Sequence, residues 1–327
     1  MTAPADPTRA AHPGALTPDA AGAAPTDGTD LLALEGLARV LTSSGHYRVL
    51  RQFRPRQRYH APCDRPLHTA LFVDVEATGL DTARDAIIEF AAVPFTYCPE
   101  RGEIHEVLAP YVALEDPGRD IPSEVQALTG ITADMVAGRR IDDLAVARLV
   151  HDVRLVIAHN AGYDRPMVER RFPLFARKPW ACSLSDVDWK HFGIRGSKLD
   201  YLLFQRCAEF FEGHRAEHDC QAAIHVLATA CDKGHPFRML LESARRPTYR
   251  VRALQAPFEV KDVLKARGYR WHGEARYWYR DCGPALLDAE LAWLCAECYE
   301  NRLGPDDLRT HHVEHFDARK RYSARVS

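Results

Sequence analysis

The sequence predicts a mixed α/β domain in the middle of a chain of 327 residues. Residues 71–75 are largely apolar and β-branched, as expected of a buried strand. Residues 87–93 and 104–114 predict two more strands, which with the first make an antiparallel meander. Buried strands at 155–158 and 180–184 follow. Helical periodicity appears at 142–151, 163–171, 198–205 and 216–230. Strands that alternate with helices in this way predict a sheet flanked by helices.

Composition places few limits on the function. The hydrophobic content of 46% is that of a globular protein, and the net charge of −2 does not indicate a nucleic-acid partner. The cysteines number nine, without the spacing of a disulfide framework, which predicts reduced thiols and a cytoplasmic protein. No stretch of apolar residues is long enough to predict a membrane span.

Changes in composition predict five segments. Residues 1–29 are rich in Ala, Pro, Thr and Asp and predict a disordered tail. Residues 30–69 form a helical and basic extension, residues 70–232 the central domain, and residues 233–250 a linker with glycine, prolines and arginines. Residues 251–327 predict a small α+β module.

The N-terminal extension begins with a helix over residues 30–41, for which Asp30 is a plausible N-cap. Five arginines then fall between Arg48 and Arg58, interleaved with Tyr47 and Phe53. Such a stretch can contact phosphates, or it can pack as a solvated arm on the central domain. The sequence favours neither interpretation.

The C-terminal module combines basic and aromatic residues. It predicts a helix over residues 261–267 ended by Gly268, then a hairpin that contains Tyr277 and Trp278. These side chains suit single-strand binding, although a module of this size needs at least one aromatic inside its core. Cys295 and Cys298 are spaced as in zinc sites, but we interpret them as one face of a helix.

Two acids interrupt the first strand. The side chains of Asp74 and Glu76 leave the same face, because side chains alternate along a strand. Neighbouring carboxylates in a buried setting need a partner, and a divalent cation is the simplest one. The alternative is a strand end with two solvated acids. Gly79 then allows a sharp turn or a close approach to a ligand.

Two further acids have a suggestive context. Asp164 lies at the start of a helix directly after a buried strand, and Asp219 lies in an otherwise apolar helix, five residues after His214. Four carboxylates that converge offer the oxygen ligands that Mg²⁺ or Mn²⁺ prefers. A nearby histidine can accept a proton from water at neutral pH.

These residues carry a resemblance to a known family. Residues 72–80, His159 to Asp164, and His214 to Asp219 resemble, in family order, the three motifs of the DEDDh 3′–5′ exonucleases. This group includes the epsilon subunit of bacterial DNA polymerase III. Residues 129–132 also look like the family, and Ala77 replaces a commoner threonine.

The resemblance implies an RNase H-like fold, with a mixed five-stranded sheet flanked by helices. It implies that Asp74, Glu76, Asp164 and Asp219 bind two divalent cations and that His214, rather than His218, is the general base. It implies substrate contacts from the following residues: Thr78, Gly79, Leu80, His159 and Asn160.

The expected activity is metal-dependent 3′–5′ exonucleolytic hydrolysis of DNA, in proofreading or repair, at single-stranded or frayed 3′ ends. A DNA polymerase is a candidate partner. The same motifs suit an exoribonuclease or an oligonucleotide-processing nuclease, because contacts to the 2′-hydroxyl are not visible in the sequence. A binding protein without turnover is the alternative from another class, and loss of an acid would have favoured it.

Overall fold

The structure is a computed structural model that describes residues 28–326. The predicted disordered tail lies outside the described residues, except for its last two residues. The described residues divide into two units, which meet between Val49 and Leu50 along the chain. In the first unit, the predicted helix is α1 (Gly28–Ser43). It begins before Asp30, which therefore lies inside the helix, so the N-cap prediction for Asp30 is wrong.

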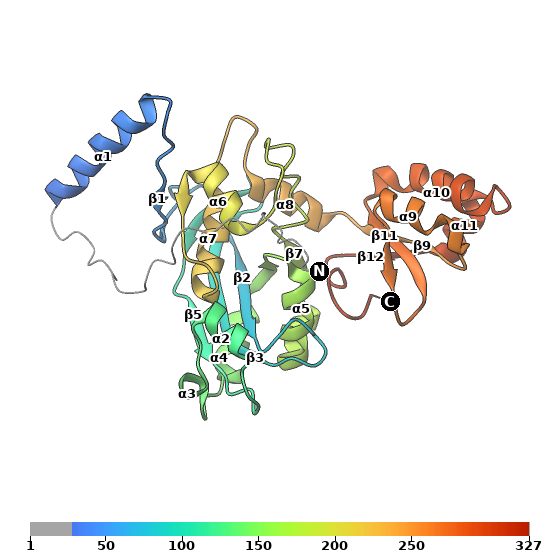
Figure 1. Cartoon of the computed structure of the whole chain (residues 1–327), viewed down its shortest axis with the longest axis horizontal. Helices are drawn as coiled ribbons and strands as arrows, with labels where there is room; N and C mark the ends of the chain where they lie inside the picture. Colours follow the sequence, from blue (N-terminus) through green and yellow to red (C-terminus); the bar gives the residue numbers. More distant parts are fainter. Residues whose placement is uncertain (1–27, 327) are drawn as a thin grey trace, which may run out of the picture. The chain divides into compact units, whose positions relative to one another are not determined.

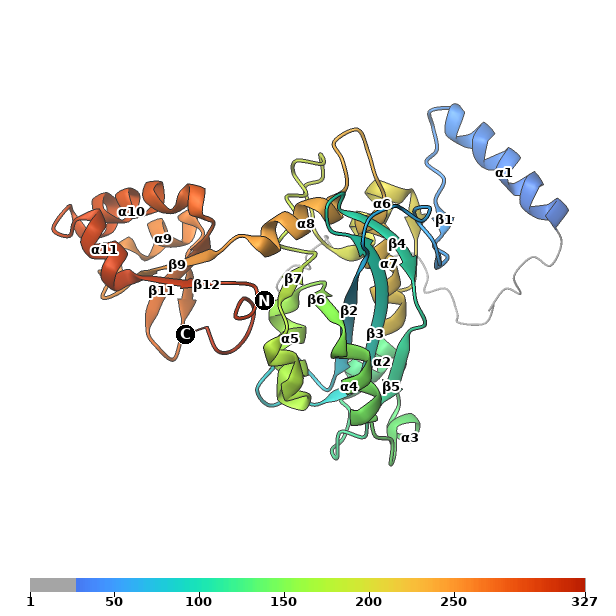
Figure 2. The same cartoon turned by 180° about the vertical axis from the view of Figure 1, so that it is seen from behind.

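A mixed sheet organises the second unit (Figures 1 and 2). The strand order is β4 (Glu103–Val107), β3 (Ile87–Cys98), β2 (His68–Ala77), β6 (Val153–Ala158) and β7 (Trp180–Cys182). β2, β3 and β4 are antiparallel neighbours, whereas β6 and β7 run parallel to β2. The predicted fold class, a mixed five-stranded sheet flanked by helices, is therefore confirmed, with one strand in addition.

That additional strand corrects one prediction. Residues 104–114 do not form one strand but two, β4 and β5 (Tyr111–Leu114), and both pair with β3. β4 lies beside the end of β3 and β5 beside its start. Pro110 has no N–H to give to a ladder and restricts the residue before it, so the chain breaks there.

Helices cover both faces of the sheet. Their bounds are α2 (Ser123–Thr129), α3 (Ala133–Val136), α4 (Asp143–His151), α5 (Ala161–Arg171), the 3₁₀ turn η1 (Pro173–Arg177), α6 (Leu199–Cys207), α7 (Ala216–Ala228) and α8 (Pro236–Arg245). Side chains alternate along β2: Phe72 packs in the core with α6, α7 and α8, whereas Leu71 and Val73 pack in the core with α4 and α5. Asp74 and Glu76 share the register of Phe72 and so face α7.

The predicted linker over residues 233–250 is a helix for much of its length. Phe237 and Leu240 of α8 are fully buried in the core on the α7 side of the sheet. Interpreting residues 236–245 as a linker is therefore wrong, because their apolar side chains recur at helical spacing and have a core to join. The segment boundaries otherwise stay predictions.

The C-terminal module has its own sheet, in the order β10 (Arg270–His272), β11 (Tyr277–Cys282), β9 (Thr248–Ala253) and β12 (Val313–Phe316). Its helices are η2 (Phe258–Val260), α9 (Lys261–Arg267), α10 (Pro284–Tyr299) and α11 (Pro305–His312). The predicted helix, its left-handed Gly268 and the following hairpin are confirmed. Tyr277 is buried, as a small core requires, and Cys295 and Cys298 are buried in α10.

The basic arm packs on the central domain. β1 (Arg51–Gln52) pairs with β8 (Glu209–Phe210), and the side chain of Phe53 is buried in the core. Arg56 lies 3.3 Å from Glu209, and Arg58 lies 3.7 Å from Glu106. These contacts favour the packed arm over the phosphate-binding interpretation for residues 50–58. Among the described residues, no helix has the length and apolar character needed to cross a membrane.

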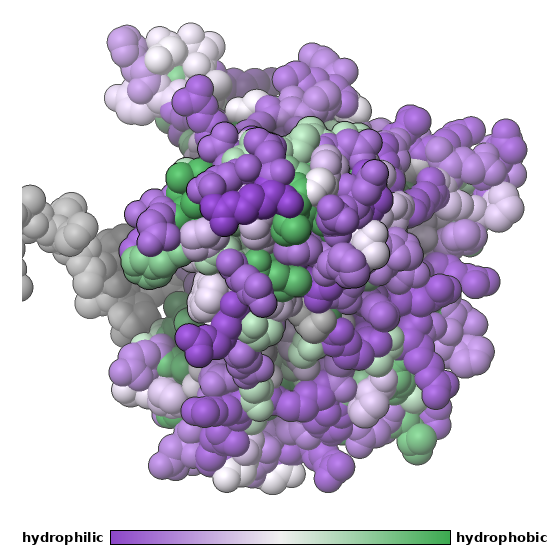
Figure 3. All heavy atoms as spheres, turned by 90° about the vertical axis from the view of Figure 1, so that its right-hand side faces the viewer, coloured by the Kyte–Doolittle hydropathy of each residue, from purple (hydrophilic) through white to green (hydrophobic). Residues whose placement is uncertain are grey.

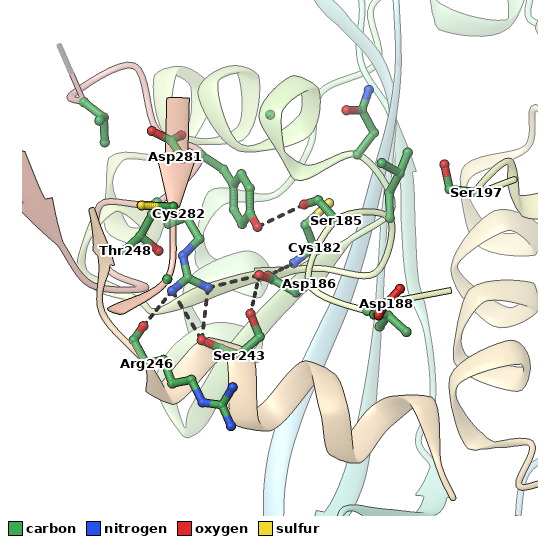
Figure 4. A pocket seen from close by; sticks show the side chains of 18 of the residues that line it. Cys182, Ser185, Asp186, Asp188, Ser197, Ser243, Arg246, Thr248, Asp281 and Cys282 are labelled. Atoms are coloured by element: carbon green, nitrogen blue, oxygen red, sulfur yellow. Dashed lines mark hydrogen bonds and ion pairs between the residues drawn. The ribbon is translucent and has the colours of Figure 1, made fainter. Parts of the chain in front are cut away.

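The end of the chain returns to the central domain. The guanidinium of Arg165 on α5 is fully buried, and it donates hydrogen bonds to the backbone carbonyls of Ala318 and Arg321 at 3.0 and 2.6 Å. Arg321 in turn lies 3.1 Å from Asp186, which accepts a hydrogen bond from Ser243 (Figure 4). Residues 317–326 therefore supply partners for buried polar groups of the central domain.

We expect a chain truncated after Phe316 to lose stability. The truncation removes the backbone carbonyls that accept hydrogen bonds from the buried Arg165, which keeps Glu169 and the Trp180 ring, and it removes the arginine that faces Asp186. Together, lost hydrogen bonds to buried charged groups of this kind cost about 3 kcal/mol or more. Urea denaturation measures the loss, with Lys320→Ala, an exposed side chain on the same segment, as the matched control. Equal stability of the truncated and full-length chains would contradict the assignment.

Candidate active site

The site lies at the carboxyl end of β2. One carboxylate oxygen from each of Asp74, Glu76 and Asp219 lies within 4.8 Å of the others. β2 contributes the first two, and Asp219 comes from the first turn of α7, on the face toward which both side chains point. The structure thus brings together three of the four predicted metal ligands from segments more than a hundred residues apart.

Asp164 reaches the same place from the opposite face of the sheet. It is buried in the first turn of α5, and its Oδ1 accepts a hydrogen bond of 3.2 Å from the backbone N–H of Val75. Its charge is the strongest neighbouring influence on Asp74. α5 begins directly after β6, the parallel neighbour of β2, and this topology places Asp164 beside the middle of the acid cluster.

Burial and mutual repulsion make the cluster costly without a cation. Burial first, and then the charges of Asp164, Asp219 and Glu76, hold the pKa of Asp74 well above its ordinary range. Burial and the nearby Asp219 raise the pKa of Glu76 to about 8. The pKa of Asp219 rises to about 6, mainly through burial. The cation-free cluster therefore holds protons near neutral pH.

An ion pair that sequence reasoning did not assign borders the cluster. Glu89 is buried opposite Glu76 in the register of β2 and β3, and its carboxylate accepts hydrogen bonds from Arg215 at 2.9 Å and from the Ala216 N–H at 3.0 Å. Glu89 thus fixes the start of α7, and Asp219 with it. Two features could have indicated this ion pair: the register of β3 and the position of Arg215 beside His214.

The two candidate histidines are both exposed. His214 has a left-handed backbone with φ 67° just before α7, a conformation unusual outside glycine, and His218 lies within the first turn of α7. Both imidazoles lower the pKa of Asp219, His214 more strongly than His218. The structure therefore places both near the acids.

The loop after β2 holds the residues predicted to contact substrate. Thr78 is buried, and its hydroxyl donates to Asp85 at 3.0 Å, so its polar group has an internal partner. A Cβ at Gly79 would lie 2.5 Å from the Asp85 carboxylate, which explains why glycine stands there. Tyr163 donates to the Gly79 carbonyl at 2.8 Å. Leu80 is 87% exposed beside this fixed loop.

In the second motif, His159 contacts protein groups, whereas Asn160 is exposed to solvent. His159 contacts the Ser183 hydroxyl and the Ser197 carbonyl, each at 2.8 Å, so both ring nitrogens have protein partners. Burial lowers the pKa of His159 to about 4 and keeps it neutral. Both polar atoms of the ring therefore face protein groups, and the substrate contact of His159 stays a prediction. Asn160 is exposed with φ 76° and lines a cleft of 1290 Å³.

That cleft extends to the C-terminal module and is lined by side chains of both charges. Arg195, Lys190 and Asp188 line it from the central domain, and Arg246, Arg270 and Asp281 line it from the chain that leads into and forms the module. Asp188, Arg246 and Asp281 are labelled in Figure 4. The face that the module presents is mainly hydrophilic, with small separate hydrophobic areas (Figure 3). The cleft suits a polar ligand better than an apolar one.

The domain with this fold and acid cluster matches a known family. Residues 71–227 match the family model described as exonuclease, RNase_T. This part of the chain is therefore an exonuclease domain, and the resemblance stated from the motifs is confirmed at that level.

Curated relatives agree with this assignment. The chain is 26% identical over 201 residues to the DNA polymerase III subunit epsilon of Treponema pallidum, which covers 59% of this chain and 85% of that protein. It is 27% identical over 170 residues to the PolC-type DNA polymerase III of Bacillus subtilis, which covers 49% of this chain and 11% of that protein. The chain thus spans only about a tenth of the PolC-type relatives that it matches.

Solved structures show a more distant likeness. Escherichia coli exonuclease I in complex with a dA16 oligonucleotide matches with a TM-score of 0.45 and 18% identity, over 77% of this chain and 64% of that one. Exonuclease X in complex with 5′-overhanging duplex DNA matches with a TM-score of 0.39 and 24% identity, over 53% of this chain and 99% of that one.

The acid cluster fits a divalent cation. Its donors are all carboxylate oxygens, they converge within 4.8 Å, and their raised pKa values show that no positive group nearby compensates them fully. Oxygen-only donor sets of this kind suit Mg²⁺ or Mn²⁺.

Asp74→Asn should stabilise the cation-free protein in a pH-dependent way. Because folding raises the pKa values of these carboxyls, the folded wild-type protein is most stable at a pH below their ordinary values of 3.8 for Asp219 and 4.5 for Glu76. This stability is lost as the pH rises through the folded-state pKa values, about 6 for Asp219 and about 8 for Glu76. Removing one interacting charge reduces that loss. The variant should gain about 2 kcal/mol over wild type at about pH 8.5, and little at about pH 4.

Urea denaturation in EDTA at the two pH values measures this difference. Asp134→Asn, an exposed acid remote from the cluster in sequence, is the control and should change stability equally at both. A gain for Asp74→Asn that does not grow with pH would mean that Asp74 does not interact with the other acids.

Proposed function

We propose that the protein is a metal-dependent 3′–5′ exonuclease that hydrolyses DNA and releases nucleoside monophosphates. The observation that carries the proposal is the convergence of Asp74, Glu76 and Asp219, with Asp164 beside them, in a domain of the exonuclease family. Asp74, Glu76, Asp164 and Asp219 would hold two divalent cations. Such a pair supplies a nucleophilic water and neutralises charge on the attacking and leaving oxygens of a phosphodiester.

The chain's own groups complete the chemistry. His214 takes the proton of the attacking water, because its exposed imidazole lies near Asp219. Arg215, held by Glu89 and partly exposed, presents a positive charge to the phosphate. Leu80 projects from the fixed loop toward solvent and offers an apolar surface for the terminal base.

Single-stranded or frayed 3′ ends are the proposed substrates, and a DNA polymerase is a candidate partner because of the epsilon-like relative. The C-terminal module has a smaller part in binding than its basic composition suggests. Arg267 pairs with Glu290 and Arg270 with Asp281, so these cations are engaged inside the module. Trp271, which is 50% exposed, is the better candidate for stacking on a base.

Degradation of labelled substrates tests the function. Single-stranded DNA, duplex DNA and RNA carrying a 5′ label are each incubated with Mg²⁺, Mn²⁺ or EDTA. We expect DNA to shorten stepwise from the 3′ end with either metal and to stay intact with EDTA or with Asp74→Asn. Preferential shortening of RNA would support the exoribonuclease alternative. Binding to DNA without shortening, in wild type and variant alike, would support the non-catalytic binding protein.

The rate of hydrolysis distinguishes the roles of His214 and His218. His214→Ala should slow hydrolysis by roughly 10²–10⁴-fold, the usual contribution of a general base, whereas His218→Ala should have a much smaller effect. Single-turnover digestion at saturating metal compares the chemical step in both variants. A reversed order, or equal losses, would show that His214 is not the general base.

A further inference from the structure

A second group of potential ligands lies outside the acid cluster. One ligand atom from each of His60, Glu103 and His235 lies within 4.8 Å of the others. They come from three segments: the arm before β2, the first residue of β4, and the residue before α8. All three side chains are partly exposed, so an ion can reach them.

This group is remote from the proposed catalytic acids. Along β3, Glu103 pairs with Cys98, whereas Asp74 pairs with Ala91. The intervening strand corresponds to about 23 Å at a rise of about 3.3 Å per residue. The two groups therefore lie at opposite ends of the sheet, and one ion cannot serve both.

Backbone contacts orient two imidazoles for binding through Nε2. Nδ1 of His60 lies 2.7 Å from the carbonyl of Ile104, and Nδ1 of His105 lies 2.8 Å from the carbonyl of Ala61. A carbonyl only accepts, so each Nδ1 carries the hydrogen and each Nε2 presents a lone pair. Metal-binding histidines in proteins are commonly oriented in this way.

The side chain of His105 is a second, independent indication that a cation binds here. Its side chain is 4% exposed, and its buried Nε2 has no hydrogen-bond partner among the described residues. The nearest carboxylate oxygen, from Glu103, is 3.9 Å away, which is too far for a hydrogen bond. A buried nitrogen without a partner is costly, and a cation between the two groups would remove that cost.

The candidate imidazoles lie close to one another. The rings of His60 and His235 lie 5.3 Å apart, and those of His60 and His105 lie 5.8 Å apart. Arg101 approaches Glu103 to 3.9 Å but is half exposed, so it can turn away.

We propose that His60, Glu103 and His235 bind a zinc ion, beside the unpartnered Nε2 of His105. Two imidazole nitrogens and one carboxylate oxygen favour Zn²⁺ over Mg²⁺, which prefers oxygen. Side-chain shifts of about 1 Å bring the ligand atoms to the spacing that Zn–N bonds of ~2.0–2.1 Å require. The ion would join the arm, β4 and α8. The backbones of the arm and β4 already meet where the Tyr59 N–H donates to the His105 carbonyl. The ion would have a structural role, because its ligands come from three segments of the chain.

The test measures the number of zinc ions bound per full-length chain. Asp74→Asn and Asp219→Asn are combined to disable the acid cluster, and the protein is dialysed against Zn²⁺ and then against zinc-free buffer. His60→Asn keeps an amide N–H near the position of Nδ1 and removes Nε2, His235→Ala removes a second ligand, and His311→Gln alters an exposed histidine as the control. Plasma mass spectrometry gives zinc per chain, and thermal unfolding is followed with Zn²⁺ and with Mg²⁺.

We expect one zinc per chain in the double variant and in the His311→Gln control, and none after His60→Asn or His235→Ala. Zn²⁺ at about a hundred times its Kd should raise the melting temperature by roughly 5 °C, an effect absent with Mg²⁺ and in both site variants. Zinc that persists in both site variants would overturn the proposal. So would a double variant that binds none.

Discussion

Electrostatic repulsion among carboxylates at the end of β2 is the constraint on which the site depends. Asp74 and Glu76 share one face of a strand that is otherwise buried, and Asp219 approaches them from α7. Such a cluster is tolerable only where a cation, or bound protons, compensate it. The start of α7 also faces the acids, and its backbone N–H groups favour negative charge there. Glu89 and Arg215 hold that helix end in place from the neighbouring strand.

Two layers of the fold meet at this point. Asp74 and Glu76 face α7, whereas Asp164 comes from α5 on the other side of the sheet and contacts the backbone of β2 at Val75. Only the edge where β2 and β6 both end allows residues from the two layers to approach each other. The packed loop around Asp85 leaves the Leu80 side chain exposed to solvent.

The end of the chain links the C-terminal module to the stability of the exonuclease domain. The carbonyls of residues 318–321 provide hydrogen-bond partners for Arg165, and Arg321 faces Asp186. Arginine suits this place because its planar group donates several hydrogen bonds at once. A domain that needs the last residues of the chain cannot be separated cleanly from the module that precedes them, so any effect of removing the module combines binding with folding.

Local pattern alone predicted the strands at 71–75 and 87–93, the helices around α4 to α7, and the helix and hairpin of the C-terminal module. These elements carry their periodicity and end signals within a few residues. The acids and their order along the chain were also visible in the sequence. Their convergence came from the resemblance to known exonucleases, because no local pattern states which segments meet.

Tertiary structure decided what side chains do after they meet their neighbours. Thr78 and His159 carry polar groups that looked available in the sequence, yet Asp85, Ser183 and the Ser197 carbonyl occupy them. Residues 236–245 resembled a linker until the core that buries Phe237 was in place. Hydrogen-bond partners and buried surface are contributed by residues distant in the chain, so a sequence determines which groups are present, and only packing decides which of them remain open to a ligand.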